Sequence, residues 1–258
     1  MARVHRTAIV EAGAVLGPEV VIGAYAVVGP HVELAEGVEL GPHAVVTGHV
    51  RIGARTRVFP QAVLGGEPQH QDYAGEPTRL EIGCDNVIRE HVSIHVGTVR
   101  GGGCTRIGAA NLVMNGSHIA HDCVVGSHTV IASFSGLAGH SVVEDHAVLG
   151  AYTGVHQHAR VGESAMTASG AKLSLDAPPF ALVAGDRARL VGLNRVGLRR
   201  RGFAAETVRA IARAHHLVFA SRLPLAEALE RVEAELAGVP QVAHWLDFLR
   251  RSERGFCR

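Results

Sequence analysis

The sequence predicts a mainly β solenoid, a coil of short parallel strands, followed by a small helical domain. Three observations support this prediction. A branched aliphatic residue occupies every sixth position from Val10 to Leu64, usually followed by glycine. Helices repeat about every 3.6 residues and ordinary strands about every two, so neither explains a period of six. The composition is 47% hydrophobic but only 4% aromatic, which suits an aliphatic core, and helical spacing is absent before about residue 200.

The repeat predicts a triangular coil in which each hexapeptide forms one face. One aliphatic side chain per hexapeptide points inward and stacks on its counterpart in the next coil, which builds a continuous apolar column. Glycine beside it suits the bend, where either a positive φ or a close approach of two backbones is needed. The first predicted inward residues are Val10, Leu16, Ile22, Val28, Leu34, Leu40, Val46, Ile52, Val58 and Leu64.

Two interruptions are expected to leave the coil as loops. The first, at about 66–81, contains Pro68 and Pro77 and lacks inward aliphatic residues. The second, at about 97–105, contains a glycine triplet without the lysine of a phosphate-binding loop, so we expect a flexible loop. Loops on a regular scaffold are common places for function. The inward residues continue with Ile82, Ile88, Ile94, Ile107, Val113, Ile119, Val125, Ile131, Leu137, Val143, Leu149, Val155, Val161, Thr167 and Leu173.

The repeat stops at 176–179, and an arginine-rich connecting stretch follows. Three helices are predicted beyond it, at about 204–220, 224–237 and 240–252, with Pro224 and Pro240 near helix starts. We therefore divide the chain into a β-helical domain, 1–186, and a helical domain, 187–258. The helices would close an end of the solenoid that otherwise exposes its core and an unpaired edge.

Composition and charge limit the function classes. A net charge of +1 argues against broad nucleic-acid binding. Neither an apolar signal segment nor a run of membrane-spanning length is present, so we expect a cytoplasmic protein without stable membrane insertion. The four cysteines lack C-x-x-C spacing and are expected to be free thiols in a reducing compartment.

The chain contains 17 histidines, and the spacing of some of them is the main sign of a functional site. Residues 18 apart lie one above the other in successive coils, at roughly the 4.8 Å interstrand distance. His121, His140 and His156 fall within one residue of the same column, with His118 and Asp122 beside them. Such a cluster suits a general base oriented by a carboxylate, or a zinc site. The alternative is a solvated edge of histidines bonded to backbone carbonyls, the interpretation we keep for His128, His146 and His158.

Several motifs together resemble the UDP-N-acetylglucosamine O-acyltransferase family, which takes the first step of lipid A synthesis. They are Asn115-Gly-Ser-His-Ile-Ala-His-Asp-Cys123, Leu137-Ala-Gly-His140, Val155-His-Gln157, Tyr73-Ala-Gly-Glu-Pro-Thr-Arg79 and Gly197-Leu-Arg-Arg-Arg-Gly202. The resemblance covers nearly the whole chain. It implies a left-handed parallel β-helix, an exception to the usual right-handed crossover, and a homotrimer with active sites between subunits. It also implies acyl transfer from acyl carrier protein to the sugar 3-hydroxyl without a metal or other cofactor.

The resemblance assigns roles residue by residue. His121 matches the general base, Asp122 the carboxylate that orients it, and Gly139 the backbone N–H that stabilises the oxyanion. The matching substrate-binding positions are His118, His140, His156 and Gln157, and the nucleotide-binding positions are Asn194, Arg200 and Arg201. Because acyl carrier proteins are acidic, the docking patch expected for the donor consists of Arg199, Arg200, Arg201, Arg209, Arg213 and Arg222.

The chain departs from the family pattern in three places. His70 and Asp72 stand where an aspartate and a lysine are common, which leaves open whether the acceptor carries a 3-hydroxyl or a 3-amino group. Val196 stands where a glutamate is frequent. Ser169 replaces the glycine of the acyl-length position and is expected to shorten the acyl pocket slightly.

Three alternatives stay open at this point. The related N-acyltransferase normally has an additional N-terminal domain, whereas the repeat here starts by Val10. A zinc carbonic anhydrase on the same fold usually spaces two ligand histidines five apart, while His118 and His121 are three apart. An inactive trimeric scaffold would not need to retain His121 and Asp122.

Overall fold

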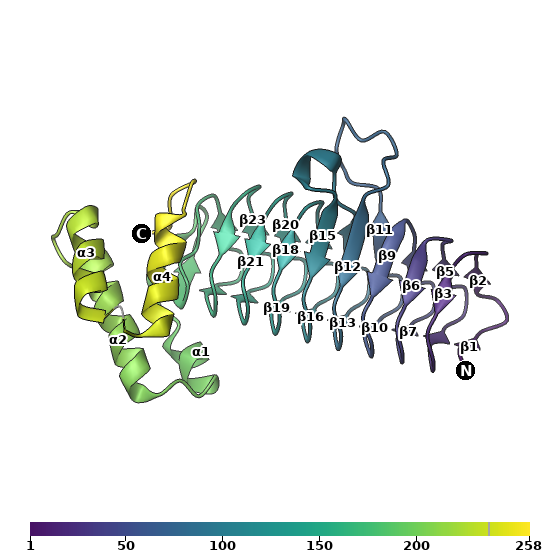
Figure 1. The fold of residues 1–258 in the computed structure, drawn as a ribbon, viewed down its shortest axis with the longest axis horizontal. Coiled ribbons are helices and arrows are strands. Elements are labelled where there is room, and N and C mark those ends of the chain that lie inside the picture. Colours follow the sequence, from purple (N-terminus) through teal and green to yellow (C-terminus); the bar gives the residue numbers. More distant parts are fainter. Residues whose placement is uncertain (237) are drawn as a thin grey trace.

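The computed structural model describes residues 1–236 and 238–258. The chain winds into a parallel β-helix with three flat sheets, and helices lie at its C-terminal end (Figure 1). Within the described residues, the sheets contain 11, 9 and 8 strands, which we name sheets A, B and C. From β1 to β26, successive strands of the chain belong to different sheets, so each coil contributes one strand to each face.

Sheet A consists of β1 (Arg3–Val4), β4 (Val21–Ile22), β7 (Glu39–Leu40), β10 (Arg57–Val58), β13 (Val87–Ile88), β16 (Leu112–Val113), β19 (Val130–Ile131), β22 (Val148–Leu149), β25 (Met166–Thr167), β27 (Ala181–Ala184) and β28 (Arg189–Leu193). Sheet B consists of β2 (Ile9–Val10), β5 (Val27–Val28), β8 (Val45–Val46), β11 (Val63–Gly66), β14 (Ser93–His95), β17 (His118–Ile119), β20 (Gly136–Leu137), β23 (Gly154–Val155) and β26 (Lys172–Leu173). Sheet C consists of β3 (Val15–Leu16), β6 (Val32–Leu34), β9 (His49–Ile52), β12 (Arg79–Ile82), β15 (Cys104–Ile107), β18 (Val124–Val125), β21 (Val142–Val143) and β24 (Arg160–Val161).

The predicted inward column is confirmed. Residues 18 apart pair in the uninterrupted coils, as in Val125 with Val143 and Val143 with Val161. Every predicted inward residue from Ile22 to Leu173 is buried, including Thr167 at 0% exposure. Val10 and Leu16 are only partly buried because they lie in the first coil, which has no coil before it.

The repeat glycines serve the close approach of neighbouring coils rather than a left-handed bend. A Cβ atom at Gly53 would lie 2.5 Å from the carbonyl carbon of Gly83 in the next coil. The positive φ falls two residues later, on Arg55 at 57°, and the same position is left-handed around most of the solenoid. L residues rarely adopt this conformation, so the coil itself holds the corner residues in it.

Both predicted loops project from the coil near each other (Figure 1). The first connects the end of β11 at Gly66 to the start of β12 at Arg79. The second contains a short 3₁₀ helix, η1 (Val99–Gly101), and ends where β15 begins at Cys104.

The C-terminal part contains four α-helices within the described residues: α1 (Arg195–Arg200), α2 (Ala205–His215), α3 (Leu225–Leu236) and α4 (Pro240–Arg250). A π-helical turn, η2 (His216–Ala220), continues α2. The predicted helices correspond to α2 with η2, α3 and α4, although Ala237 lies outside the described residues. Helix α1 was not predicted because its six residues bury only Leu198 and show no apolar periodicity. β27 and β28 form an antiparallel hairpin across the expected domain boundary after residue 186.

A second core joins the helices to the end of the solenoid. It contains Leu198, Ile211, Trp245 and Phe248, and Phe180 brings the last coil into contact with it. The half-buried Arg160 on β24 forms a 3.0 Å ion pair with buried Asp176, and its guanidinium lies over the Phe248 ring of α4. The helices therefore attach through packing and through Arg160, whose Nη2 also donates a 2.6 Å hydrogen bond to the Phe248 carbonyl of α4. Within the described residues, none of the helices is sufficiently long and apolar to cross a bilayer.

Candidate active site

His121 and Asp122 lie at the corner between β17 and β18, where sheet B meets sheet C. Nδ1 of His121 lies 2.8 Å from Oδ2 of Asp122, and both side chains are buried. Asp122 is one of the left-handed corner residues, with φ of 58°. This backbone conformation brings its carboxylate next to the preceding imidazole. The Nδ1 contact leaves Nε2 of a neutral His121 available to accept a proton.

The second loop packs tightly around this carboxylate. The backbone N–H of Thr98 donates a 2.9 Å hydrogen bond to Oδ1 of Asp122, and its hydroxyl donates one of 2.6 Å to Oδ2. Gly101 leaves no space for a side chain, because a Cβ there would lie 2.0 Å from Cγ of Asp122. Thr98 therefore holds the Asp122 carboxylate with two hydrogen bonds, and the missing side chain of Gly101 leaves the space that this carboxylate occupies.

Gly139 lies against the His121 ring. A Cβ at this position would be 2.5 Å from Cε1 and 2.7 Å from Nε2 of His121. Among the hydrogen bonds of the described residues, the Gly139 N–H donates none within the chain. A free donor beside the basic nitrogen suits an oxyanion that forms where the base works.

Further histidines surround this pair. The rings of His70 and His140 stand edge-on to His121, with centroids 5.4 and 5.2 Å away, and Nε2 of His140 lies 3.9 Å from the Asp122 carboxylate. Nδ1 of His118 lies 2.8 Å from the Ser93 hydroxyl. Burial lowers the pKa of both His118 and His140, although the Asp122 charge partly opposes this at His140. Burial therefore favours the neutral form of the His118 and His140 imidazoles.

Two more histidines belong to the cluster: His158, for which we kept the solvated-edge interpretation, and His95, which we did not select from the sequence. His158 stacks on His140 at 4.6 Å, and His95 stands edge-on to His118 at 4.9 Å. Burial lowers the pKa of His95 to about 4. His158 is 18 residues beyond His140, so the coil spacing already contained the signal for it. His95 precedes the second loop, which shifts the phase and hides its position. His156 and Gln157 lie exposed at the same corner.

A metal ion also has potential ligands here. His121, Asp122 and His140 offer ligand atoms within 4.8 Å of one another. Asp122, however, already accepts hydrogen bonds from Thr98 N–H, the Thr98 hydroxyl and His121, so binding a metal would compete with these contacts. The donor set fits a hydrogen-bonded catalytic pair at least as well as a metal site.

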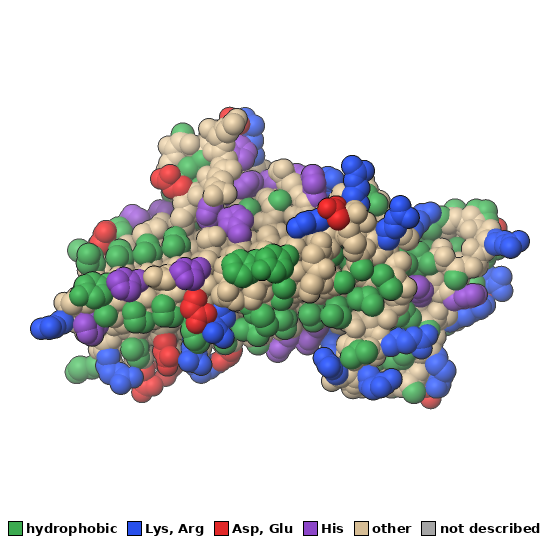
Figure 2. All heavy atoms as spheres, turned by 180° about the vertical axis from the view of Figure 1, so that it is seen from behind, with side chains coloured by type: hydrophobic (Ala, Val, Ile, Leu, Met, Phe, Trp, Pro, Cys, Tyr) green, Lys and Arg blue, Asp and Glu red, His purple; other side chains and the backbone are tan. Residues whose placement is uncertain are grey.

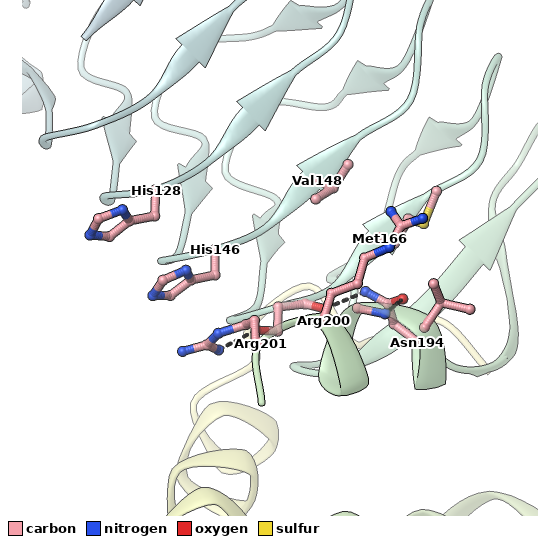
Figure 3. A pocket seen from close by; sticks show the side chains of 10 residues that line it. His128, His146, Val148, Met166, Asn194, Arg200 and Arg201 are labelled. Atoms are coloured by element: carbon pink, nitrogen blue, oxygen red, sulfur yellow. Dashed lines mark hydrogen bonds between the residues drawn. The ribbon is translucent and has the colours of Figure 1, made fainter. Parts of the chain in front are cut away.

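A cavity of about 440 Å³ lies at another corner, where sheet C meets sheet A (Figure 3). Its lining combines cationic or polar groups with apolar ones: His128, His146, Ser164, Asn194, Gly197, Arg200, Arg201, Val148, Met166 and Val196. Figure 3 shows His128 and His146 on successive coils facing the arginines of α1, and their rings stack at 4.8 Å. Burial, followed by the charge of Arg201, lowers the pKa of His146. The cavity suits an anionic ligand that also has a planar apolar part.

Asn194 organises the helix that lines this cavity. Its side-chain oxygen caps α1 by accepting a 2.9 Å bond from Gly197 N–H, and its amide donates to the Ser164 carbonyl at 2.9 Å. An asparagine is a favourable N-cap. The buried Asn194 side chain therefore fixes α1 to the coil and so places Arg200 and Arg201.

Comparison with known proteins identifies the family. The hexapeptide transferase model, described as bacterial transferase hexapeptide (six repeats), matches residues 104–139, and the model for UDP N-acetylglucosamine O-acyltransferase, domain 2, matches 176–257. An acyl-[acyl-carrier-protein]–UDP-N-acetylglucosamine O-acyltransferase from Thiobacillus denitrificans is 48% identical over all of both chains. The same-named protein from Myxococcus xanthus is 47% identical, also over the full length of both chains.

The chain belongs to the UDP-N-acetylglucosamine O-acyltransferase family. Solved structures agree: LpxA from Acinetobacter baumannii has a TM-score of 0.96 and 39% identity, covering 99% of each chain. The UDP-N-acetylglucosamine acyltransferase from Campylobacter jejuni has a TM-score of 0.94 and 36% identity, again covering 99% of each chain. The predicted family and the predicted left-handed parallel β-helix with C-terminal helices are confirmed. The comparisons do not favour the carbonic anhydrase or the 3-amino acceptor.

The positions at which the chain departs from the family pattern lie in different places. The His70 ring lies edge-on to that of His121, whereas Asp72 is exposed in the first loop and pairs with Arg100 at 3.3 Å. Val196 is an exposed residue at the edge of the cavity. Ser169 is exposed at the third corner, between sheets A and B. Within one chain, the predicted site residues therefore occupy three separate edges of the solenoid.

Proposed function

We propose that this protein transfers a 3-hydroxy fatty acyl chain from acyl carrier protein to the 3-hydroxyl of UDP-N-acetylglucosamine, the first step of lipid A synthesis, in the cytoplasm. The observation that carries the proposal is the buried His121–Asp122 pair with the free Gly139 N–H beside it. The names of the full-length relatives support the two substrates.

The chain's own residues account for the chemistry. His121 Nε2 accepts the proton of the sugar 3-hydroxyl while that oxygen attacks the thioester carbonyl. The Gly139 N–H donates to the oxyanion that forms, and such a donor typically contributes about 3–4 kcal/mol. When the C–S bond breaks, protonated His121 gives the proton to the leaving thiolate, which departs as the thiol. Asp122 keeps the imidazole in the required tautomer and stabilises its charged form.

A homotrimer would complete this site. The catalytic corner and the arginine-lined cavity lie on different edges of one protomer, so one substrate reaches both only if a second protomer supplies one of them. We propose that Asn194, Arg200 and Arg201 of one subunit bind the nucleotide whose sugar reaches His121 of its neighbour, where His118, His140, His156 and Gln157 position the substrates. Arginine forks suit a diphosphate.

The helical end suits docking of the acidic acyl carrier protein. Figure 2 shows arginine side chains gathered over this end of the molecule. Arg213 is already paired with Glu235 at 3.1 Å. Arg200 and Arg201 line the cavity. We therefore assign the docking role mainly to Arg199, Arg209 and Arg222, by charge complementarity.

An acyl-transfer assay tests the proposal. Purified protein is given acyl carrier protein thioesters of several chain lengths, with UDP-N-acetylglucosamine and its 3-amino analogue in parallel and a zinc chelator present. We expect ester formation with the 3-hydroxy sugar despite chelation, and a profile of chain lengths that reports on Ser169. Preference for the 3-amino sugar would assign that acceptor instead, and loss of turnover with the chelator would support the metal interpretation.

A further inference from the structure

Arg201 lines the cavity, and contacts with Glu163, Ser164 and Phe203 hold its side chain. Its Nη1 atom lies 2.6 Å from Oε1 of Glu163 and also bonds to the Ser164 hydroxyl. The guanidinium carbon lies 4.7 Å from the centre of the Phe203 ring. Within the described part of the chain, the hydrogen bonds of this side chain all use Nη1, which leaves Nη2 and Nε as donors for a ligand.

Glu163 holds this arginine from behind. It lines the neighbouring pocket of about 320 Å³ with Glu144 and His244, and is not among the described residues that line the cavity itself. Its second carboxylate oxygen lies 4.0 Å from Nε2 of His244 on α4. The carboxylate therefore contacts Arg201 without entering the space available to an anionic ligand.

Glu144 and His244 lie next to Glu163 and bind each other. The Glu163 backbone N–H donates a 2.8 Å bond to Glu144, whose same oxygen lies 2.9 Å from Nε2 of His244. The hydrogen bond to Glu144 raises the pKa of His244. His244 thus pairs with Glu144, and Arg201 pairs with Glu163.

We propose that Glu163 is a positioning residue that pre-orients Arg201 toward the diphosphate of the nucleotide sugar. This inference rests on the proposed function, because that function places the nucleotide in the cavity. An arginine held from behind loses less side-chain freedom on binding than a mobile one, and its planar fork is already aimed. Glu163 acts through Arg201 and makes no contact with the ligand.

A double-mutant cycle tests this, with UDP as the probe and calorimetric titration of the full-length protein as the measurement. We expect Glu163→Ala to weaken UDP binding roughly tenfold. Glu163→Gln keeps an acceptor oxygen and should stay within about threefold of the wild type. In an Arg201→Ala background, Glu163→Ala should have no further effect. In acyl transfer, Glu163→Ala should raise KM for the sugar nucleotide and leave kcat unchanged.

The matched control is Glu233→Ala, which removes a carboxylate from an equally short 2.6 Å pair with Arg250, away from the cavity. It should leave UDP binding unchanged. Unchanged or tighter binding by Glu163→Ala, additive losses in the double mutant, or no UDP binding by the wild type would each overturn the inference. UDP binding without acyl transfer would reject the proposed reaction while leaving the inference standing.

Discussion

The hydroxyl of Thr98 donates a 2.6 Å hydrogen bond to the Asp122 carboxylate, across 24 residues of sequence. The bond ties the second loop to the catalytic corner. It means that the loop determines where the carboxylate points, and so how the His121 ring is oriented.

Thr98→Val should reduce kcat roughly tenfold or more with little change in KM, because a hydrogen bond to a charged group is worth about 1.5–3 kcal/mol. Steady-state acyl-transfer kinetics measure this. Thr78→Val is the control, because its buried hydroxyl has no hydrogen-bond partner within the described residues. Equal kcat values for the two variants would contradict the role of Thr98.

Gly139→Ala should reduce kcat by at least about 10², since its methyl group would displace the His121 ring from the position that it occupies against this glycine. The backbone N–H of residue 139 is still present in this variant. The expected loss of kcat therefore comes from the displaced His121 ring, which no longer has the right position relative to this N–H. Kinetics together with a thermal melt check the prediction. An active variant with a normal Tm would show that the glycine is not required.

Asp176→Ala should lower the free energy of unfolding by about 3–5 kcal/mol, because it leaves the half-buried Arg160 without its carboxylate. The helical end should detach first, which protease sensitivity within α4 would report. Glu33→Ala removes an ion pair with Arg51 that is largely exposed, and should cost about 1 kcal/mol or less. Equal costs in urea denaturation would refute the importance of this junction.

The helical core should lose stability in mild acid. Burial lowers the pKa of His215 to about 4, and its Nε2 has no hydrogen-bond partner within the described residues. Below about pH 6.5 the unfolded chain binds a proton at this residue that the folded protein does not, so stability falls as pH falls toward 4. Between pH 7 and 5, this single group accounts for about 2 kcal/mol.

His215→Leu should remove that contribution. We expect its free energy of unfolding to fall by about 2 kcal/mol less than that of the wild type between pH 7 and 5. Urea denaturation at both pH values measures the difference. Parallel pH profiles for the two proteins would show that folding does not change the pKa of His215.

The solenoid was predictable because one repeating contact determines it. Every coil places one aliphatic residue in the same column, so the period alone identifies the buried residues. Two features were hidden. A left-handed corner at Arg55 or Tyr25 is an unusual conformation for such residues, and helix α1 relies on the Asn194 cap rather than on an apolar face.

The contact between His121 and Asp122 was predictable because the two residues are adjacent in the chain. Their support was not, since Thr98 reaches Asp122 through a loop whose length breaks the coil spacing. His128 and His146 stand 18 apart, and the spacing could have paired them. That they line a cavity could not be predicted, because the cavity also needs Arg200 and Arg201 at the end of α1.

The number of residues between paired positions shows how many residues each coil contains. Uninterrupted coils pair residues 18 apart, whereas Arg57 pairs with Val87 and Val87 with Leu112, 30 and 25 apart. The two loops therefore add 30 − 18 = 12 and 25 − 18 = 7 residues without turning any later side chain onto another face. Inserting or deleting 18 residues ahead of the first loop should therefore leave the alignment of the later coils unchanged.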